Sequence, residues 1–402
     1  MTKTKPWEVF HVFLRLGLTS FGGPIAHLGY FRNELVSRRR WISEEHYGQL
    51  VGLCQFLPGP ASSQVGFALG FIRGGYLGAV AAWAAFTLPS ALLLVLFAIG
   101  AVNLDGAIAE GLVIGLKAVA VAVVAHAVWG MAKSLTPDLR RILIGIVAVA
   151  LVLLLPSNIG QIGAIVAGII AGVIWCRHLV QTQPAPLSVA ISKYVGIISV
   201  VLFAVLLFGL PIITALWDDP WVSLTDAFYR AGALVFGGGH VVLPLLQAEP
   251  AVTEAVSQDQ FLAGYGAAQA VPGPLFTFAA FLGFEMGSGG SAWLSAALAL
   301  VSVFLPGILL LLATLPFWSK IQQNQVARSA VLGANAAVVG IMTAALITPI
   351  ITEGITGYAT LIIAVGCFAL LLFAKVPAWS VVFVGGLVGV VASVTDVGLT
   401  WV

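Results

Sequence analysis

The residues that could do chemistry in this sequence lie in two glycine- and proline-rich motifs, and each motif occurs twice. The first motif is Gln55-Phe56-Leu57-Pro58-Gly59-Pro60, which returns as Gln269-Ala270-Val271-Pro272-Gly273-Pro274. The second is Phe21-Gly22-Gly23-Pro24, which returns as Phe236-Gly237-Gly238-Gly239-His240. Proline lacks a backbone donor and interrupts a helix, whereas proline at a first helical position is favourable. Each motif therefore predicts a break between two half-helices.

The half-helices that start after these four breaks could bind an anion. The first amides of a helix have no intrahelical partner and carry partial positive charge. Glycine would let a polyatomic oxyanion approach the backbone closely. We therefore predict substrate contacts at the break residues Phe21, Gly22, Gly23, Pro58, Gly59, Pro60, Phe236, Gly237, Gly238, Gly239, Pro272, Gly273 and Pro274, with hydroxyl donors from Ser62, Ser63 and Thr277. The alternative is that the glycines only permit kinks and tight helix packing.

Two arginines occupy matched positions in apolar surroundings, six residues before each Phe-Gly-Gly motif. These are Arg15 and Arg230. An unpaired arginine in such surroundings is costly, so each should face a cavity or a carboxylate. Its planar fork of donors also suits a tetrahedral oxyanion. The alternative is that each side chain reaches to the lipid headgroups.

Further polar residues could line a pathway to the site. Lys117 lies within an apolar span, and Asn335 takes its place in the second copy. The alternative for Lys117 is that it reaches back to the nearby outer face. Gln55 and Gln269 could bind the ligand or satisfy carbonyls that the breaks leave free. His240 could titrate, but its counterpart is Ile25 and satisfied packing is the favoured explanation for a lone histidine.

The remaining reactive residues predict no metal site and no cofactor. The three cysteines and the other histidines show no paired ligand spacing, which argues against haem or a metal centre. No Walker A sequence is present, and no Asp or Glu lies clearly in the middle of a span. A membrane redox enzyme is therefore disfavoured, and a proton relay cannot be assigned.

The elements that must position these residues are membrane helices. The chain has 402 residues, of which 60% are hydrophobic and 8% are charged, and apolar runs of roughly spanning length follow one another. This composition predicts an all-α polytopic membrane protein. The net charge of +2 is too small to suggest nucleic acid.

The second half of the sequence repeats the first at an offset of about 215 residues. Besides the motifs, Leu88-Pro89 matches Leu305-Pro306, and Gly115 matches Gly333. We therefore divide the chain into a first repeat at 1–178, a linker and connecting span at 179–217, and a second repeat at 218–402.

The charges in the joints predict that the two repeats have inverted topology. The joint after the first Gly-Gly motif carries four arginines, whereas the matching joint carries Glu249, Glu254 and Asp259 without any Lys or Arg. The next matched joints reverse this contrast, since 103–110 has no basic residue and 319–328 has Lys320 and Arg328. Threading the chain by this rule gives about nine full spans and four broken or re-entrant segments, with a cytoplasmic N-terminus and an external C-terminus.

The two motifs in both copies, with the arginines that precede them, resemble the chromate ion transporter family in its long, two-domain form. The resemblance covers nearly the whole chain. It implies tandem homologous halves and export of chromate from the bacterial cytoplasm across the inner membrane, driven by the membrane potential, with sulfate as a related oxyanion. One departure is that Gly239-His240 stands where the first copy has Pro24-Ile25, which loosens that half-helix start.

We therefore expect a secondary active transporter of chromate rather than an enzyme. The alternative is an importer of sulfate or another oxyanion, or a passive anion channel. The expected partners are chromate, sulfate as a second substrate and the lipid bilayer, with no nucleic acid. A homodimer is an open alternative for its assembly.

Overall fold

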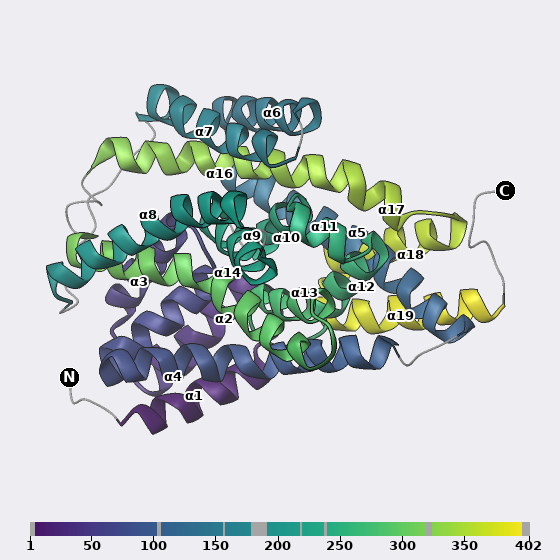
Figure 1. The fold of residues 1–402 in the computed structure, drawn as a ribbon, viewed down its shortest axis with the longest axis horizontal. Helices are drawn as coiled ribbons and strands as arrows, with labels where there is room; N and C mark the ends of the chain where they lie inside the picture. Colours follow the sequence, from purple (N-terminus) through teal and green to yellow (C-terminus); the bar gives the residue numbers. More distant parts are fainter. Residues whose placement is uncertain are drawn as a thin grey trace.

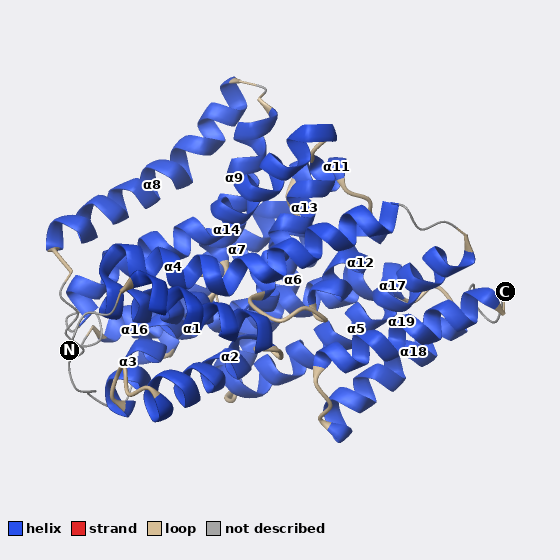
Figure 2. Cartoon of the chain, turned by 90° about the horizontal axis from the view of Figure 1, so that it is seen from below, coloured by secondary structure: helices blue, strands red, loops and turns tan. Residues whose placement is uncertain are grey.

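The computed structural model describes residues 5–102, 106–155, 157–177, 191–217, 219–236, 239–318 and 324–395, and within them every regular element is a helix (Figures 1 and 2). The first half contains α1 (Pro6–Thr19), α2 (Gly23–Phe31), η1 (Arg32–Arg38), α3 (Glu44–Phe56), α4 (Ala61–Val102), α5 (Ala107–Leu135), α6 (Leu139–Leu154) and α7 (Ser157–Trp175). The prediction of an all-α chain is confirmed.

The second half follows the connecting helix α8 (Lys193–Leu216). It contains α9 (Pro220–Leu234), η3 (Gly239–Val241), α10 (Val242–Gln247), α11 (Pro250–Ala255), α12 (Gln258–Ala268), η4 (Leu275–Thr277), α13 (Phe278–Met286), η5 (Gly289–Ser291), α14 (Ala292–Thr314), η6 (Leu315–Phe317), α16 (Gln325–Ala345), η7 (Leu346–Ile351), α17 (Thr352–Gly354), α18 (Tyr358–Ala369), η8 (Leu370–Ala374) and α19 (Ala378–Val394).

Polar caps fix where several helices begin at the joints. The Asp138 carboxylate accepts a hydrogen bond from the Arg141 amide at 3.1 Å before α6, and Asp219 accepts from the first amides of α9. Ser257 and Gln260 form a capping box at the start of α12. These caps lie between apolar segments, so they hold the joints that the sequence places at the membrane surfaces.

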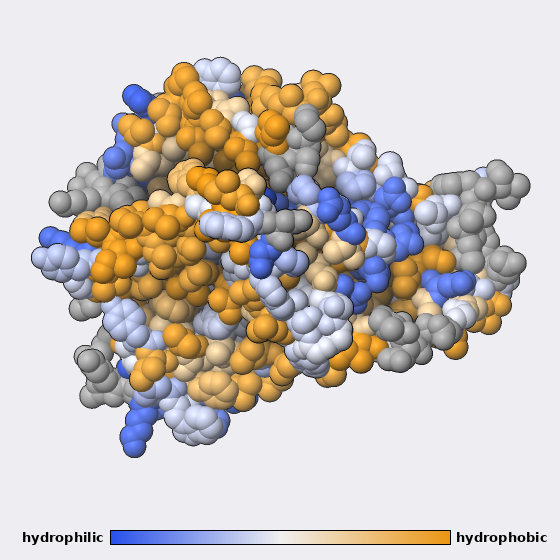
Figure 3. Space-filling model, viewed as in Figure 1, coloured by the Kyte–Doolittle hydropathy of each residue, from blue (hydrophilic) through white to orange (hydrophobic). Residues whose placement is uncertain are grey.

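Length and hydropathy identify the helices that could cross a membrane. Five stretches of the described residues are long and apolar enough, and they are Ala61–Gly100, Ala107–Leu135, Lys193–Leu216, Gly289–Phe317 and Gln325–Gly354. Shorter apolar helices include Ile159–Trp175, Tyr358–Ala374 and Ala378–Val394. Only 11% of the most apolar stretch of α8 is buried inside the protein, so most side chains of this helix point outward. Hydrophobic side chains cover the face around α8, and hydrophilic ones gather toward α11 and α12 (Figure 3).

The long helix α4 is two segments that fold back on each other. Gly75 has φ 63° and ψ −155° in its interior, outside the helical region. Gly70 packs directly against Gly78, and a methyl group at Gly70 would lie 2.7 Å from the Ala82 side chain. A straight helix would hold residues 70 and 82 about 18 Å apart, since each residue adds 1.5 Å. The first arm of α4 therefore belongs with α3, and the second arm is a separate span.

In the first half, contacts join the two ends of each broken segment. Glu8 at the start of α1 lies 3.8 Å from Arg39, which follows α2 and η1. The guanidinium groups of Arg39 and Arg73 both stack on Trp41, at 5.9 and 5.2 Å from its ring centre. Residues 10–30 and 48–71 therefore enter and leave on one side of the molecule, as the charge pattern predicts.

The second half repeats this arrangement. Gln260 at the start of α12 donates to the Glu285 carboxylate near the end of α13 at 3.0 Å. Arg230 in α9 reaches Glu249, which follows α10. Each half therefore contains two hairpins of half-helices, and these account for the four broken segments of the prediction.

The two halves are interlocked through matched glycines. In the first half, α5 packs against α18 and α19 of the second half, whereas α16 packs against α6 and α7. A methyl group at Gly111 would lie 2.7 Å from the Gly389 carbonyl oxygen, and one at Gly168 would lie 2.7 Å from the Gly333 carbonyl oxygen. The last helices of each half therefore pack against the other half, and a pseudo-two-fold axis relates the two sets of contacts. In keeping with an odd number of spans, α1 begins and α19 ends toward opposite ends of the molecule (Figure 1).

Candidate functional site

The Pro-Gly-Pro motifs interrupt the chain where the sequence predicts. The first lies between Phe56, the last residue of α3, and Ala61, the first of α4. The second lies between α12 and η4. Gly59 has φ 112° and Gly273 has φ 100°, a region that side chains with a Cβ rarely enter. Glycine is therefore required at the centre of both breaks.

Each Pro-Gly-Pro break is bonded to the Phe-Gly-Gly break of the other half. The Gly59 amide donates to the Val235 carbonyl at 2.7 Å, and the Gly273 amide donates to the Ser20 carbonyl at 2.9 Å. Val235 and Ser20 are matched residues that directly precede the two Phe-Gly-Gly motifs. These reciprocal bonds bring all four breaks to one place.

Close packing of small residues completes this meeting point. A methyl group at Gly239 would lie 3.4 Å from the Pro24 ring, and these two residues are matched in the repeats. A methyl group at Gly59 would lie 3.0 Å from the Gly307 Cα atom, and one at Gly273 would lie 2.6 Å from Ser90 Oγ. The pseudo-two-fold axis therefore passes near Pro24 and Gly239. Gly237 and Gly238, which the sequence also nominates, lie outside the described residues.

The carbonyls freed by the first break are satisfied by Gln64. Its Nε2 atom donates to the Pro58 and Gly307 carbonyls, at 2.9 Å each. The sequence suggests Gln55 for this role, but Gln55 is exposed on α3. Its counterpart Gln269 is half-buried beside Tyr265. Gln64 therefore links the two halves at the site in place of the predicted glutamines.

The three predicted hydroxyl donors have different surroundings. Thr277 donates its hydroxyl to the Pro274 carbonyl at 2.7 Å, which closes the start of η4. Ser62 Oγ lies 3.3 Å from His27 Nδ1. Ser63 Oγ is buried and finds no hydrogen-bond partner within the described residues. Ser63 is therefore the hydroxyl of this set that is available to a ligand.

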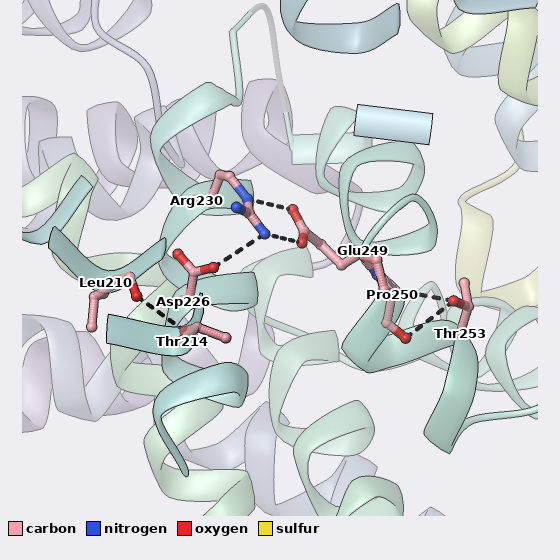
Figure 4. Close-up of polar contacts among 7 residues, drawn as sticks. All are labelled: Leu210, Thr214, Asp226, Arg230, Glu249, Pro250 and Thr253. Atoms are coloured by element: carbon pink, nitrogen blue, oxygen red, sulfur yellow. Dashed lines mark hydrogen bonds and ion pairs between the residues drawn. The ribbon is translucent and has the colours of Figure 1, made fainter. Parts of the chain in front are cut away.

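The two matched arginines lie in different environments. Arg230 donates to both oxygens of Glu249, at 3.0 and 2.5 Å, and lies 3.2 Å from Asp226 (Figure 4). Both carboxylates are buried, with exposures of 3% for Glu249 and 5% for Asp226. Arg15 is exposed and forms no ion pair with any described residue. The carboxylate alternative therefore holds for Arg230, whereas Arg15 keeps its donors free.

The predicted pathway residues are also held in separate contacts. The buried Lys117 ammonium lies 2.6 Å from the exposed Asp259 carboxylate, so it reaches toward the joint that the sequence places outside. The half-buried His240 accepts or donates a 2.7 Å hydrogen bond with the Tyr265 hydroxyl through Nδ1. The Asn335 Oδ1 atom is buried without a partner in the described part of the chain.

The aromatic residues of the Phe-Gly-Gly motifs are half-buried. The Phe21 ring lies 6.0 Å from the Trp379 ring of the second half, and Phe236 packs against the main hydrophobic core. Within the described residues, no group of three or more His, Cys, Asp or Glu side chains gathers where a metal ion could bind.

The family model named Chromate transporter matches residues 7–173 and 222–390, once in each repeat. The chain belongs to the chromate transporter family. A chromate transport protein from Cupriavidus metallidurans is 28% identical over 94% of this chain and 91% of its own length. One from Pseudomonas aeruginosa is 26% identical over 85% of this chain and 80% of its own. A probable chromate transport protein from Synechococcus elongatus is 27% identical over 85% and 83%. No solved structure matches the chain.

In this chromate transporter family member, sequence reasoning missed several residues that make polar contacts around the breaks and Arg230. From the sequence, Asp226 and Glu249 are interpreted as charges in the joints between helices. Their closeness to Arg230 is visible only in the structure. Gln64 lies five residues after Gly59, where helical spacing alone gives no sign of a bond to the other half. His27 lacks a matched histidine, which hid its place beside Ser62. The rule that a buried cation pairs with a carboxylate was the signal that could have identified the two acidic partners of Arg230.

Proposed function

We propose that this protein is a secondary active transporter that exports chromate from the cytoplasm across the bacterial inner membrane. The observation that carries the proposal is the pair of reciprocal bonds, from Gly59 to Val235 and from Gly273 to Ser20. These bonds gather four half-helix ends between two matched halves. Membership of the chromate transporter family, and relatives named as chromate transport proteins, supply the substrate class.

The site suits a tetrahedral dianion held mainly by neutral donors. Half-helix starts offer free amides and partial positive charge without the cost of a buried, unpaired cation. Because Arg230 is engaged by two carboxylates, Arg15 is the arginine that would offset the charge of the substrate. Sulfate, which is also tetrahedral, would compete with chromate for the same donors.

Transport would follow from the inverted repeats. Breaks at matched positions let one half rock against the other, so that the same residues face first one side and then the other. The hydrogen bonds between Gly59 and Val235 and between Gly273 and Ser20 cross the boundary between the halves. Their alternate making and breaking would couple the Pro-Gly-Pro hairpin of each half to the Phe-Gly-Gly hairpin of the other half.

The orientation is part of the proposal and is testable by itself. Positive charge around Arg39 supports a cytoplasmic joint, and the acidic joint around Thr253 supports an external one. Both residues are exposed. Arg39→Cys should react with an impermeant maleimide only in inverted vesicles, and Thr253→Cys only in intact cells. Labelling of both from the same face would refute the inverted topology.

Transport itself is tested in inverted vesicles with radiolabelled chromate. A carrier that exports chromate should accumulate it above the external concentration and lose this accumulation when the membrane potential is collapsed. A passive anion channel should only equilibrate chromate. An importer should instead accumulate chromate or sulfate in right-side-out vesicles. Either of these two results would replace export by the corresponding alternative.

Substitutions in the site should remove chromate resistance at matched membrane levels. Arg15→Ala removes the free arginine, and Gly59→Leu places a side chain where a methyl group would already lie 3.0 Å from Gly307. Gly29→Leu is the matched control, because a Cβ at Gly29 meets nothing within 4 Å. Resistance equal to wild type in both site variants would contradict the proposed site.

A further inference from the structure

A group of buried polar side chains lies on one side of the meeting point, and several of its polar atoms have no partner in the contacts described above. We call it the hydroxyl cluster, and its members are Ser20, His27, Ser62, Ser63, Thr87 and Ser90. All six side chains are buried, with exposures between 0% and 4%. All six belong to the first repeat.

Three contacts join the members near the Gly273 break. The Ser20 carbonyl accepts from the Gly273 amide at 2.9 Å. A methyl group at Gly273 would lie 2.6 Å from Ser90 Oγ and 3.2 Å from the Phe86 carbonyl oxygen. The Ser90 hydroxyl donates to the Thr87 carbonyl at 3.0 Å. Ser20, Phe86 and Ser90 therefore approach Gly273 from the first repeat, and Thr87 is bonded to Ser90.

The same neighbourhood includes the start of α4. The His27 ring meets the Phe86 ring edge-on at 5.3 Å, and Phe86 directly precedes Thr87. His27 Nδ1 lies 3.3 Å from Ser62 Oγ in the first turn of α4, where Ser63 follows. The cluster thus lies between the first turn of α4 and its returning arm.

Three hydroxyl oxygens of the cluster lack partners although they are fully enclosed. Ser20 Oγ, Ser63 Oγ and Thr87 Oγ1 find no hydrogen-bond partner among the described residues, whereas the His27 ring is bonded to Ser62 and to the Ser20 backbone. Buried polar atoms are nearly always bonded, and several unbonded ones in one place indicate a missing ligand or water. The first-turn amides of α4 add unpaired donors beside Ser63.

The matched positions of the second repeat carry no such cluster. Ser20, His27, Ser62 and Thr87 correspond to Val235, Val242, Phe276 and Phe304. Ser63 corresponds to Thr277, whose hydroxyl is already bonded to the Pro274 carbonyl. The polar atoms are therefore not needed for the shared fold, because the second repeat makes the same hairpin with apolar side chains.

We infer that the transported oxyanion binds off the pseudo-two-fold axis, within the first repeat, where the hydroxyls of Ser20, Ser63 and Thr87 donate hydrogen bonds to it. The inference rests on the proposed function and assigns its substrate to one half. The donors are neutral and the start of α4 is partially positive, which suits a tetrahedral dianion such as chromate or sulfate. A cation is disfavoured, since the contacts of Ser20, His27, Ser63 and Thr87 include no carboxylate within the described chain.

Direct binding tests this assignment separately from transport. The purified full-length protein in detergent is titrated calorimetrically with chromate and with sulfate. Ser63→Ala and Thr87→Val should each raise the Kd about tenfold, because each removes a hydrogen bond to a charged ligand. Thr87→Ser keeps the hydroxyl and should stay near wild type. Thr314→Val is the matched control, since its hydroxyl is bonded to the Leu310 carbonyl at 2.8 Å.

The outcomes separate the two proposals. Higher Kd values with unchanged melting temperatures would support the site, and chromate uptake should then show a raised KM. Wild-type affinity in both Ser63→Ala and Thr87→Val would overturn the assignment while leaving the proposed function intact. A wild-type protein that binds neither oxyanion would also overturn it. Binding without transport in vesicles would refute the proposed function and leave the hydroxyl cluster as the anion site.

Discussion

At the scale of single residues, the matched arginines show how far sequence reasoning reaches. The sequence indicates that Arg15 and Arg230 occupy equivalent positions and that each needs a compensating environment. The sequence does not identify the partner of Arg230, because Glu249 lies 19 residues away along the chain and reaches Arg230 only through the turn after α10. The same position therefore became a buried ion-pair cluster in one repeat and an exposed cation in the other.

This difference predicts opposite effects on stability. Arg230→Ala removes the arginine that pairs with two buried carboxylates, so we expect a loss of about 3–5 kcal/mol in the free energy of unfolding. Adding Glu249→Gln to Arg230→Ala should recover part of the loss. Arg15→Ala should leave the melting temperature of the purified protein unchanged, because Arg15 is exposed. Equal destabilisation by both alanine variants would contradict the structure.

A second prediction concerns the pH dependence at the arginine-rich joint. Burial opposes ionisation of Glu34, but hydrogen bonds from Arg39 and Arg38 outweigh it and lower the pKa of this carboxyl. Arg39 Nε lies 2.6 Å and Arg38 3.0 Å from its oxygens. A group with a lowered folded-state pKa stabilises the protein above its unfolded-state pKa, and this contribution is lost as the pH falls through the folded value.

The melting temperature measures this effect. Between about pH 7 and pH 3, the wild type should lose more stability than Glu34→Gln, whose side chain does not ionise. The two proteins should converge at the acidic end. Glu45→Gln is a control at an exposed position of the same joint. Parallel curves for wild type and Glu34→Gln would show that the arginines do not stabilise the ionised carboxyl.

At the scale of elements, the breaks were predictable because proline and glycine act locally. The prediction places them at Pro58-Gly59-Pro60 and Pro272-Gly273-Pro274, and helices end and begin on either side of both. The sequence also predicts a boundary near Gly75, because one apolar segment ends at Phe71 before Arg73 and the next begins at Tyr76, but the close packing of the two arms is not predictable. A single glycine gives a weak local signal, and the close approach of Gly70 and Gly78 depends on tertiary packing.

Three of the glycines with positive φ, Gly59, Gly273 and Gly75, make a graded series. Gly59→Ala and Gly273→Ala combine backbone strain with contacts of 3.0 Å to Gly307 and 2.6 Å to Ser90. Gly75→Ala has the strain alone, because a Cβ there meets nothing within 4 Å. We expect Gly75→Ala to cost about 1–2 kcal/mol and to retain transport, whereas the other two lose transport. Thermal unfolding and vesicle uptake measure the series, and equal behaviour of all three would contradict the packing at the breaks.

At the scale of the whole molecule, the sequence indicates two inverted repeats but not their interlocking. Matched glycines such as Gly115 and Gly333 predict close helix contacts. The same glycine pattern would allow α5 to pack on the last helices of its own half. In the structure, α5 instead packs on α19 and α16 packs on α7. Only tertiary packing distinguishes these arrangements, since local propensity and periodicity are the same in both.

Interlocking predicts that neither half is stable alone. A chain cut between residues 178 and 191 would leave the glycine faces of α5 in one half and α16 in the other without partners. Each half expressed alone should be degraded, and the two expressed together should copurify and restore oxyanion binding. Gly333→Leu in the second half should prevent this recovery, because a Cβ at Gly333 already lies 2.7 Å from the Gly172 Cα atom. Gly29→Leu in the first half should not. Since α5 and α16 make most of their helix contacts across the cut, a half that folds and resists protease by itself would mean that each repeat packs on its own last helices. The shared site would then lack the rigid frame that interlocking gives it.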